Sequence, residues 1–151
     1  MSGKADKAPK KSRRKAREFA VQGLYQWKLT GGDAGAILSQ LREETEFPKI
    51  DEEHLAALLR GVTGQAAELD ELVAPYLDRP AGELSPVEHA ILLLATYEMR
   101  HHPEIPYRVV INEAVELAKT YGGTDGHKFV NGVLDKLAAQ VRAVEIQGVR
   151  S

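Results

Sequence analysis

The sequence predicts an all-helical fold: a compact bundle of about six to seven helices in two small subdomains, preceded by a disordered basic arm. Ala, Leu, Glu and Lys fill long stretches, aromatic residues make up only 6% of the chain, and the alternation of apolar and polar residues typical of strands is almost absent. With 151 residues, the chain is long enough for one domain or for two small halves.

The first half begins with the basic arm. Residues 1–11 are rich in Lys, Ala, Pro and Ser and hold too few apolar side chains to form a core, so we predict disorder there. A first helix is expected from a cap at Ser12 to about Leu29, because two glycines soon follow. A shorter helix is expected over about residues 34–44.

A third helix is expected to begin at a cap on Asp51, with Pro75 distorting its last turn. An Arg-Pro-Ala-Gly segment that starts at Arg79 then interrupts the helical pattern. We therefore predict a boundary there, between a helical half over residues 12–79 and another over residues 80–151.

The second half starts with a strong helix signal. Ser-Pro-Val-Glu at residues 85–88 places an N-cap, a first-turn proline and a capping-box glutamate in order, so a helix should run from there to about Arg100. Residues 90–97 are apolar nearly all round, which indicates a central core helix. Two more helices are expected, over residues 107–121 and about 125–144.

The charges are distributed unevenly along the chain. Residues 1–17 hold eight Lys or Arg and one Asp, whereas the chain from Glu18 onward holds 12 basic and 21 acidic residues. A basic arm on an acidic body suits a nucleic acid or an anionic membrane surface, although a solubilising tail has the same composition. Charge alone leaves these three possibilities open.

The first helix adds a more specific signal. In a helical projection, one face away from the apolar seam carries Arg14, Arg17, Val21, Tyr25 and Lys28. Cations in a first turn oppose the helix dipole, each at a cost of about 0.3–1 kcal/mol, so helix stability alone would favour acids there. A basic and aromatic stripe indicates phosphate neutralisation and base stacking, with an ordinary solvated face as the alternative.

A glycine-rich segment over residues 121–129 connects two predicted helices. It lacks the spacing of a phosphate-binding P-loop and follows a helix, so no nucleoside triphosphate site is expected. Phe129 lies about 120° from the centre of the last helix's apolar seam, beside Lys128 and the helix start. It is placed either to stack on an unpaired base or to pack against the other half of the protein.

The composition offers little for catalysis or metal binding. There is no cysteine, the five histidines take no HxxxH or HExxH spacing, and Ser85 is better explained as a cap than as a nucleophile. We therefore expect no enzymatic activity, no cofactor and no metal. The chain also lacks the roughly 18 apolar residues of a membrane span and a secretory signal, so we expect a cytoplasmic protein without membrane contact.

Three segments of the chain are distinctive: RRKAREFAVQGLYQW at residues 13–27, PYRVVINEAVELAK at residues 106–119 and HKFVNGVLDK at residues 127–136. They resemble the NusB family of bacterial transcription antitermination factors. The resemblance extends from about Ser12 to Val141, and the last two segments are long and specific.

The resemblance implies two small helical subdomains and binding of the single-stranded boxA element of nascent RNA together with the ribosomal protein NusE. The pair would join an RNA polymerase complex that suppresses premature termination, notably on ribosomal RNA operons. The implied RNA contacts are Arg13, Arg14, Arg17, Asp125, Lys128 and Phe129. The implied partner contacts are Tyr25 and Glu88.

Two alternatives stay open at the level of the sequence. A helical interaction module, or a homodimer that hides the Tyr25 face, would need no RNA. NusB-like modules also occur fused to ribosomal RNA cytosine methyltransferases. This sequence has no glycine-rich cofactor motif after a strand, so methyl transfer by this chain alone is not expected.

Overall fold

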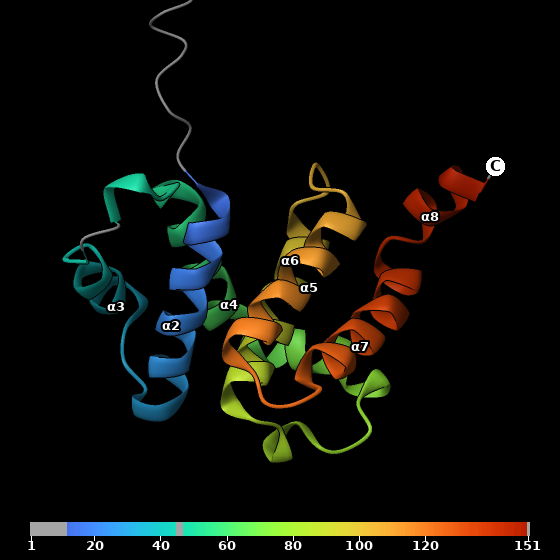
Figure 1. The fold of residues 1–151 in the computed structure, drawn as a ribbon, viewed down its shortest axis with the longest axis horizontal. Helices are drawn as coiled ribbons and strands as arrows, with labels where there is room; N and C mark the ends of the chain where they lie inside the picture. Colours follow the sequence, from blue (N-terminus) through green and yellow to red (C-terminus); the bar gives the residue numbers. More distant parts are fainter. Residues whose placement is uncertain (1–11, 45–46, 151) are drawn as a thin grey trace, which may run out of the picture. The chain divides into compact units, whose positions relative to one another are not determined.

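The computed structural model describes residues 12–44 and 47–150, which form seven α-helices, three short 3-10 helices and no strand (Figure 1). The predicted all-helical fold is therefore confirmed. The basic arm predicted over residues 1–11 lies outside the described residues. The elements in chain order are α2 (Arg13–Thr30), α3 (Ala34–Leu41), η1 (Phe47–Lys49), α4 (Glu52–Val73), η2 (Ala74–Tyr76), η3 (Ala81–Glu83), α5 (Pro86–His101), α6 (Tyr107–Tyr121), α7 (Gly126–Val141) and α8 (Ala143–Arg150).

The chain divides into two compact units, unit 1 over residues 1–60 and unit 2 over residues 61–151. The division falls within α4, whereas the break in the sequence pattern predicted it near Pro80. It lies earlier because the later part of α4 contacts α5, with Asp70 hydrogen-bonded to His89 at 2.6 Å. Within the described residues, no helix combines the length and the apolar character needed to cross a membrane.

Polar side chains begin the helices of unit 1 as predicted. The Ser12 hydroxyl accepts the backbone N–H of Lys15 at the start of α2, and Asp51 caps α4 by accepting the N–H of His54. Asp33 caps α3 in the same way. α3 ends at Leu41, earlier than the predicted end near residue 44.

The core of unit 1 forms where α2 packs against α3, η1 and α4. The Phe19 ring lies 6.3 Å from the Phe47 ring, measured between centroids. At Gly23 the helices approach so closely that a Cβ atom would lie 2.9 Å from Leu59 and 3.0 Å from Ile37. This close approach requires the glycine, and it fixes α2 against its neighbours.

Helix α4 departs from the predicted helix at two places. It ends at Val73, and the short 3-10 helix η2 that contains Pro75 follows, because proline donates no backbone N–H to a continuing helix. Inside α4, Gln65 has φ −123° and ψ 18°, which interrupts the helical backbone. The periodicity of the sequence does not predict this interruption.

Helix α5 is the core helix of unit 2, as predicted. Ten of its 16 residues are buried, and it packs against both α6 and α7. The Ser85 hydroxyl accepts the N–H of Glu88 at 3.2 Å, which confirms the predicted cap. A capping box also requires the Glu88 carboxylate to accept the backbone N–H of the N-cap residue. That part of the prediction is wrong, because the carboxylate accepts the N–H of Gly123 instead.

The last predicted helix is in fact two helices, α7 and α8, which meet at Arg142. The buried guanidinium of Arg142 donates to the carbonyls of Met99 at 2.8 Å and His102 at 3.0 Å, and so caps the end of α5. Glu145 pairs with Arg142 and accepts the N–H of Tyr107 at 3.0 Å. Burial alone would raise the pKa of Glu145, but the Tyr107 N–H and Arg142 together lower it.

Gly61 offers a test of the packing of α4 against α5. A Cβ atom at Gly61 would overlap the ring of Tyr97, whereas one at Gly64, a turn later on α4, meets nothing within 4 Å. We expect Gly61→Ala to destabilise the protein by about 1–3 kcal/mol, as overpacking does, and Gly64→Ala to be neutral or stabilising by up to about 1 kcal/mol. Urea unfolding followed by circular dichroism measures both, and equal midpoints would contradict the contact.

Candidate nucleic-acid interface

The start of α2 is basic and has no acidic residue in its first turn. Hydrogen bonds on both sides of Ser12 anchor it within unit 1: the Ser12 N–H donates to the Lys49 carbonyl at 2.8 Å, and the Ser12 carbonyl accepts the Asp51 N–H at 3.1 Å. Cations at this end oppose the helix dipole and weaken the helix. A bound anion removes that penalty, which makes this end a candidate anion-binding surface.

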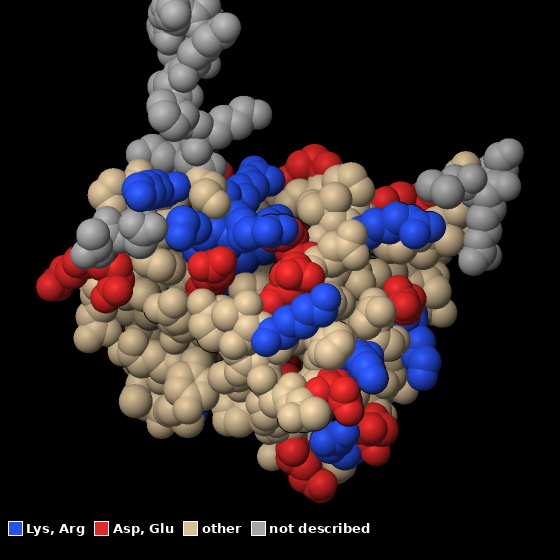
Figure 2. Space-filling view, viewed as in Figure 1, with Lys and Arg blue, Asp and Glu red and all other residues tan. Residues whose placement is uncertain are grey.

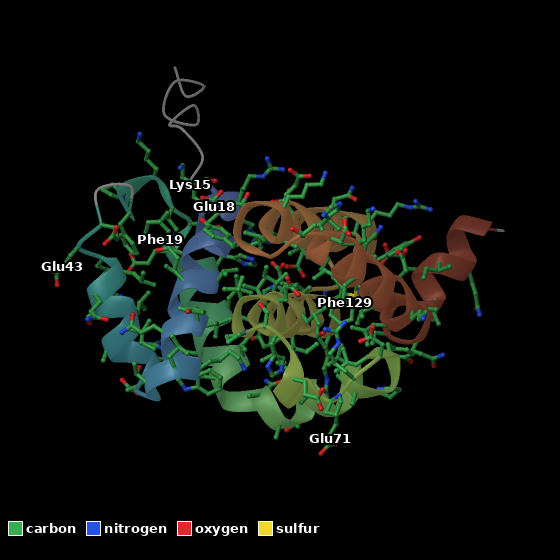
Figure 3. All side chains as sticks on the ribbon, turned by 60° about the horizontal axis from the view of Figure 1, so that its bottom comes forward. Lys15, Glu18, Phe19, Glu43, Glu71 and Phe129 are labelled. Atoms are coloured by element: carbon green, nitrogen blue, oxygen red, sulfur yellow. The ribbon has the colours of Figure 1, made fainter. Side chains whose placement is uncertain are left out.

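Two of the three predicted arginines reach the surface here. Figure 2 shows Lys and Arg side chains gathered around the start of α2, where Arg13 and Arg14 are both exposed. Arg13 lies 3.4 Å from the Asp51 carboxylate, with 45% of its side chain exposed. In Figure 3, Lys15 points away from unit 1 and Phe19 points into it.

Arg17 differs from the prediction. The helical projection placed it on an exposed stripe with Arg14, Val21, Tyr25 and Lys28, but Arg17 is only 5% exposed and Val21 only 2%. The single exposed stripe is wrong because α2 is covered on more than one side of its surface. Tyr25 remains on the surface, with 39% of its area exposed.

The second candidate segment is the turn between α6 and α7, in unit 2. Asp125 has φ 62°, and it is the one non-glycine residue of the described chain in the left-handed region, which Asp tolerates better than most residues. The N–H of Gly126 donates to the Gly123 carbonyl at 3.0 Å and closes the turn. The exposed side chains of Asp125 and Lys128 lie 3.4 Å apart, so an acid balances this lysine.

Glu88 holds this turn in place. Its Oε2 atom accepts the N–H of Gly123 at 3.0 Å. The same oxygen lies so close to Gly126 that a Cβ atom there would overlap it, so the turn requires a glycine at this position. Glu88, which the resemblance places among the partner contacts, therefore also positions the turn that carries Asp125 and Lys128.

Phe129 is half-buried, and its contact with Arg79 lies within unit 2. The Cζ atom of Arg79 lies over the ring, 5.1 Å from its centroid. Figure 3 shows Phe129 between the ribbon of α7 and the segment that carries η2 and η3. The ring is thus held by its own unit and remains partly open.

Each unit gathers its own share of the predicted residues. Unit 1 holds Arg13, Arg14, Arg17 and Tyr25 on α2, and unit 2 holds Glu88, Asp125, Lys128 and Phe129. Arg79 was not among the predicted site residues, because in the sequence it marks only a break between helices. No local pattern predicts its contact with a ring 50 positions further along the chain. The glycines at positions 122, 123 and 126 were the sequence signal for the close approach of Glu88 to the turn between α6 and α7.

The described residues do not gather three or more His, Asp or Glu side chains as a metal ion would require. His89 and Asp70 form a close pair, but His89 is only 8% exposed and the pair joins α4 to α5. Burial and the neighbouring Arg100 lower the pKa of His101, which bonds Gln65 in α4. The histidine contacts therefore hold helices together.

Fold and site together define a small all-helical protein whose exposed functional groups suit binding: cations, a partly open aromatic ring and a glycine-rich turn. The sequence model of the NusB family matches residues 14–139. The chain therefore belongs to the NusB family.

Individual relatives agree with this assignment. The chain is 66% identical over 130 residues to a protein of Nitrosospira multiformis, covering 86% of this chain and 82% of the relative. It is 58% identical over 141 residues to a protein of Paraburkholderia phytofirmans, covering 93% and 98%. Both relatives carry the name transcription antitermination protein NusB. The solved structure of T. maritima NusB superposes with a TM-score of 0.79 at 34% identity, covering 87% of this chain and 93% of that one.

Gly126 offers a test of the contact between Glu88 and the turn. We expect Gly126→Ala to displace the Glu88 carboxylate and to speed hydrogen exchange at the Gly123 N–H about fivefold, because a hydrogen bond worth about 1 kcal/mol is lost. Gly132→Ala on the same helix is the matched control, since a Cβ atom there meets nothing within 4 Å. Exchange measured by NMR that is unchanged at Gly123 in Gly126→Ala would show that Glu88 does not hold the turn.

Proposed function

We propose that this protein is a cytoplasmic, non-enzymatic transcription antitermination factor. It binds the single-stranded boxA element of nascent RNA together with the ribosomal protein NusE, and joins an RNA polymerase complex, notably on ribosomal RNA operons. Membership of the NusB family supports the antitermination role. The observation that carries the RNA-binding part is the first turn of α2, which contains no acidic residue and bears Arg13, Arg14 and Lys15 against the helix dipole.

The two segments contribute different interactions in this proposal. At the start of α2, the exposed Arg13 and Arg14 neutralise phosphates, whereas Arg17, only 5% exposed, lies beneath this surface on the same helix. At the turn before α7, Lys128 and Asp125 offer polar groups to phosphate and base edges, and Phe129 supplies a stacking surface. Single-stranded RNA offers the unstacked bases that such a surface needs.

The partner side rests on Tyr25 and Glu88. Tyr25 is 39% exposed, and Leu29, one turn further along α2, is 58% exposed, so this part of unit 1 presents apolar area. The excess of acidic residues from Glu18 onward favours a basic partner. Because Glu88 also bonds Gly123, a partner that contacts Glu88 is linked to the turn proposed to meet RNA.

The alternative is a helical interaction module or a homodimer without specific RNA binding. The exposed Tyr25 and Leu29 are the observation that favours it. Self-association that does not depend on salt, together with no preference for boxA RNA, would support this alternative over the proposal.

The RNA-binding part is tested by fluorescence anisotropy of labelled boxA RNA and a scrambled RNA across a salt series, with and without NusE. We expect a preference for boxA that NusE enhances. Arg14→Ala should reduce the slope of log affinity against log salt by about 1, because one phosphate contact is lost. Phe129→Ala should weaken boxA binding about tenfold, the size of one lost base stack.

Arg108→Ala is the matched control for Arg14→Ala, since both arginines are exposed and each is the second residue of its helix. It should leave the salt slope and the affinity for boxA unchanged. Circular dichroism and melting temperature confirm that each variant is folded. Equal binding of both RNAs, unaffected by NusE, would contradict the proposed function.

A further inference from the structure

Arg79 lies in the short connection between η2 and η3 and reaches Phe129 at the start of α7. Its Cζ atom is 5.1 Å from the centroid of the ring, within the range of a cation–π contact. Both residues belong to unit 2. The flat guanidinium of Arg79 therefore covers one face of the Phe129 ring.

A fork of two hydrogen bonds fixes the plane of this guanidinium. Its Nε atom donates to Asp78 Oδ1 at 2.7 Å, and its Nη2 atom donates to Asp78 Oδ2 at 3.2 Å. Paired bonds of this kind orient the guanidinium as well as hold it. The bond from Arg79 also lowers the pKa of Asp78.

The pairing with Asp78 changes what Arg79 can offer to RNA. The charge of the guanidinium is balanced at close range, so it is a poor site for a phosphate. Its flat face is still accessible, because 46% of the Arg79 side chain is exposed. Unpaired bases stack on guanidinium planes as they do on aromatic rings.

We infer that Arg79 is an RNA-contacting residue, with an unpaired base stacking on the outer face of its guanidinium while Phe129 supports the inner face. This inference rests on the proposed function and adds Arg79 to Phe129 in the stacking site at the start of α7. Phe129 then supports Arg79 on the face that Arg79 covers, and Asp78 sets the orientation of the guanidinium.

The test compares Arg79→Ala, Arg79→Lys and Arg108→Ala in the anisotropy assay with boxA and scrambled RNA across a salt series. Arg108 is a close match, because its Cζ atom also lies over a ring, 5.4 Å from the centroid of Tyr107, and it is exposed in the same unit. We expect Arg79→Ala to weaken boxA binding about tenfold with little change in salt slope. Arg79→Lys should lose most of that affinity, because lysine keeps the charge but not the plane. Arg108→Ala should bind like the wild type.

Three outcomes would overturn the inference. Tighter binding by Arg79→Ala would show that Arg79 is a cover that competes with the base for Phe129. Full rescue by Arg79→Lys, with a shallower salt slope for Arg79→Ala, would make it a phosphate contact. Unchanged binding by Arg79→Ala would remove it from the site. None of these three outcomes contradicts the proposed function. If the wild-type protein shows no preference for boxA RNA, both the proposed function and the inference are contradicted.

Discussion

The burial of α5 is the constraint on which unit 2 depends. This helix has few polar residues to expose to water, so α6 and α7 pack against it. The backbone groups at its ends must then form hydrogen bonds with neighbouring residues. Arg142 caps its last turn, which breaks the C-terminal helix in two. Glu88, in its first turn, takes the N–H of Gly123 and so fixes the connection between α6 and α7. The geometry of the candidate site in unit 2 therefore follows from how the core helix is covered.

The two candidate segments differ in where their acidic residues lie. The first turn of α2 carries cations and no acid. The acid beside Arg13 is Asp51, which lies outside that helix, whereas in unit 2 Lys128 lies 3.4 Å from Asp125 and Arg79 is held by the adjacent Asp78. Clustered positive charge supplies affinity for any phosphate chain, whereas oriented flat groups and polar edges distinguish one base from another. The proposed function therefore assigns strength of binding to unit 1 and selectivity to unit 2.

Local chemistry explains which features could be predicted from the sequence. Caps at Ser12, Asp51 and Ser85 act over three residues, and the helix starts that they predict are confirmed. Contacts over long distances in the chain account for the errors. The buried Arg17, the split at Arg142 and the open capping box at Glu88 all depend on side chains or surfaces brought together only by folding. The contact of Arg79 with Phe129 also depends on folding, because the residues next to Arg79 in the sequence do not predict it.

The central claim is that separate segments of the two units meet the same RNA, and NMR titration of isotopically labelled protein tests it most directly. With boxA RNA we expect shifts at the amides of residues 13–17 and of residues 122–129, together with the side-chain Nε–H of Arg79. With scrambled RNA the shifts should be confined to residues 13–17, where charge alone acts. Identical shifts with both RNAs, or no shift over residues 122–129 with boxA, would contradict the account.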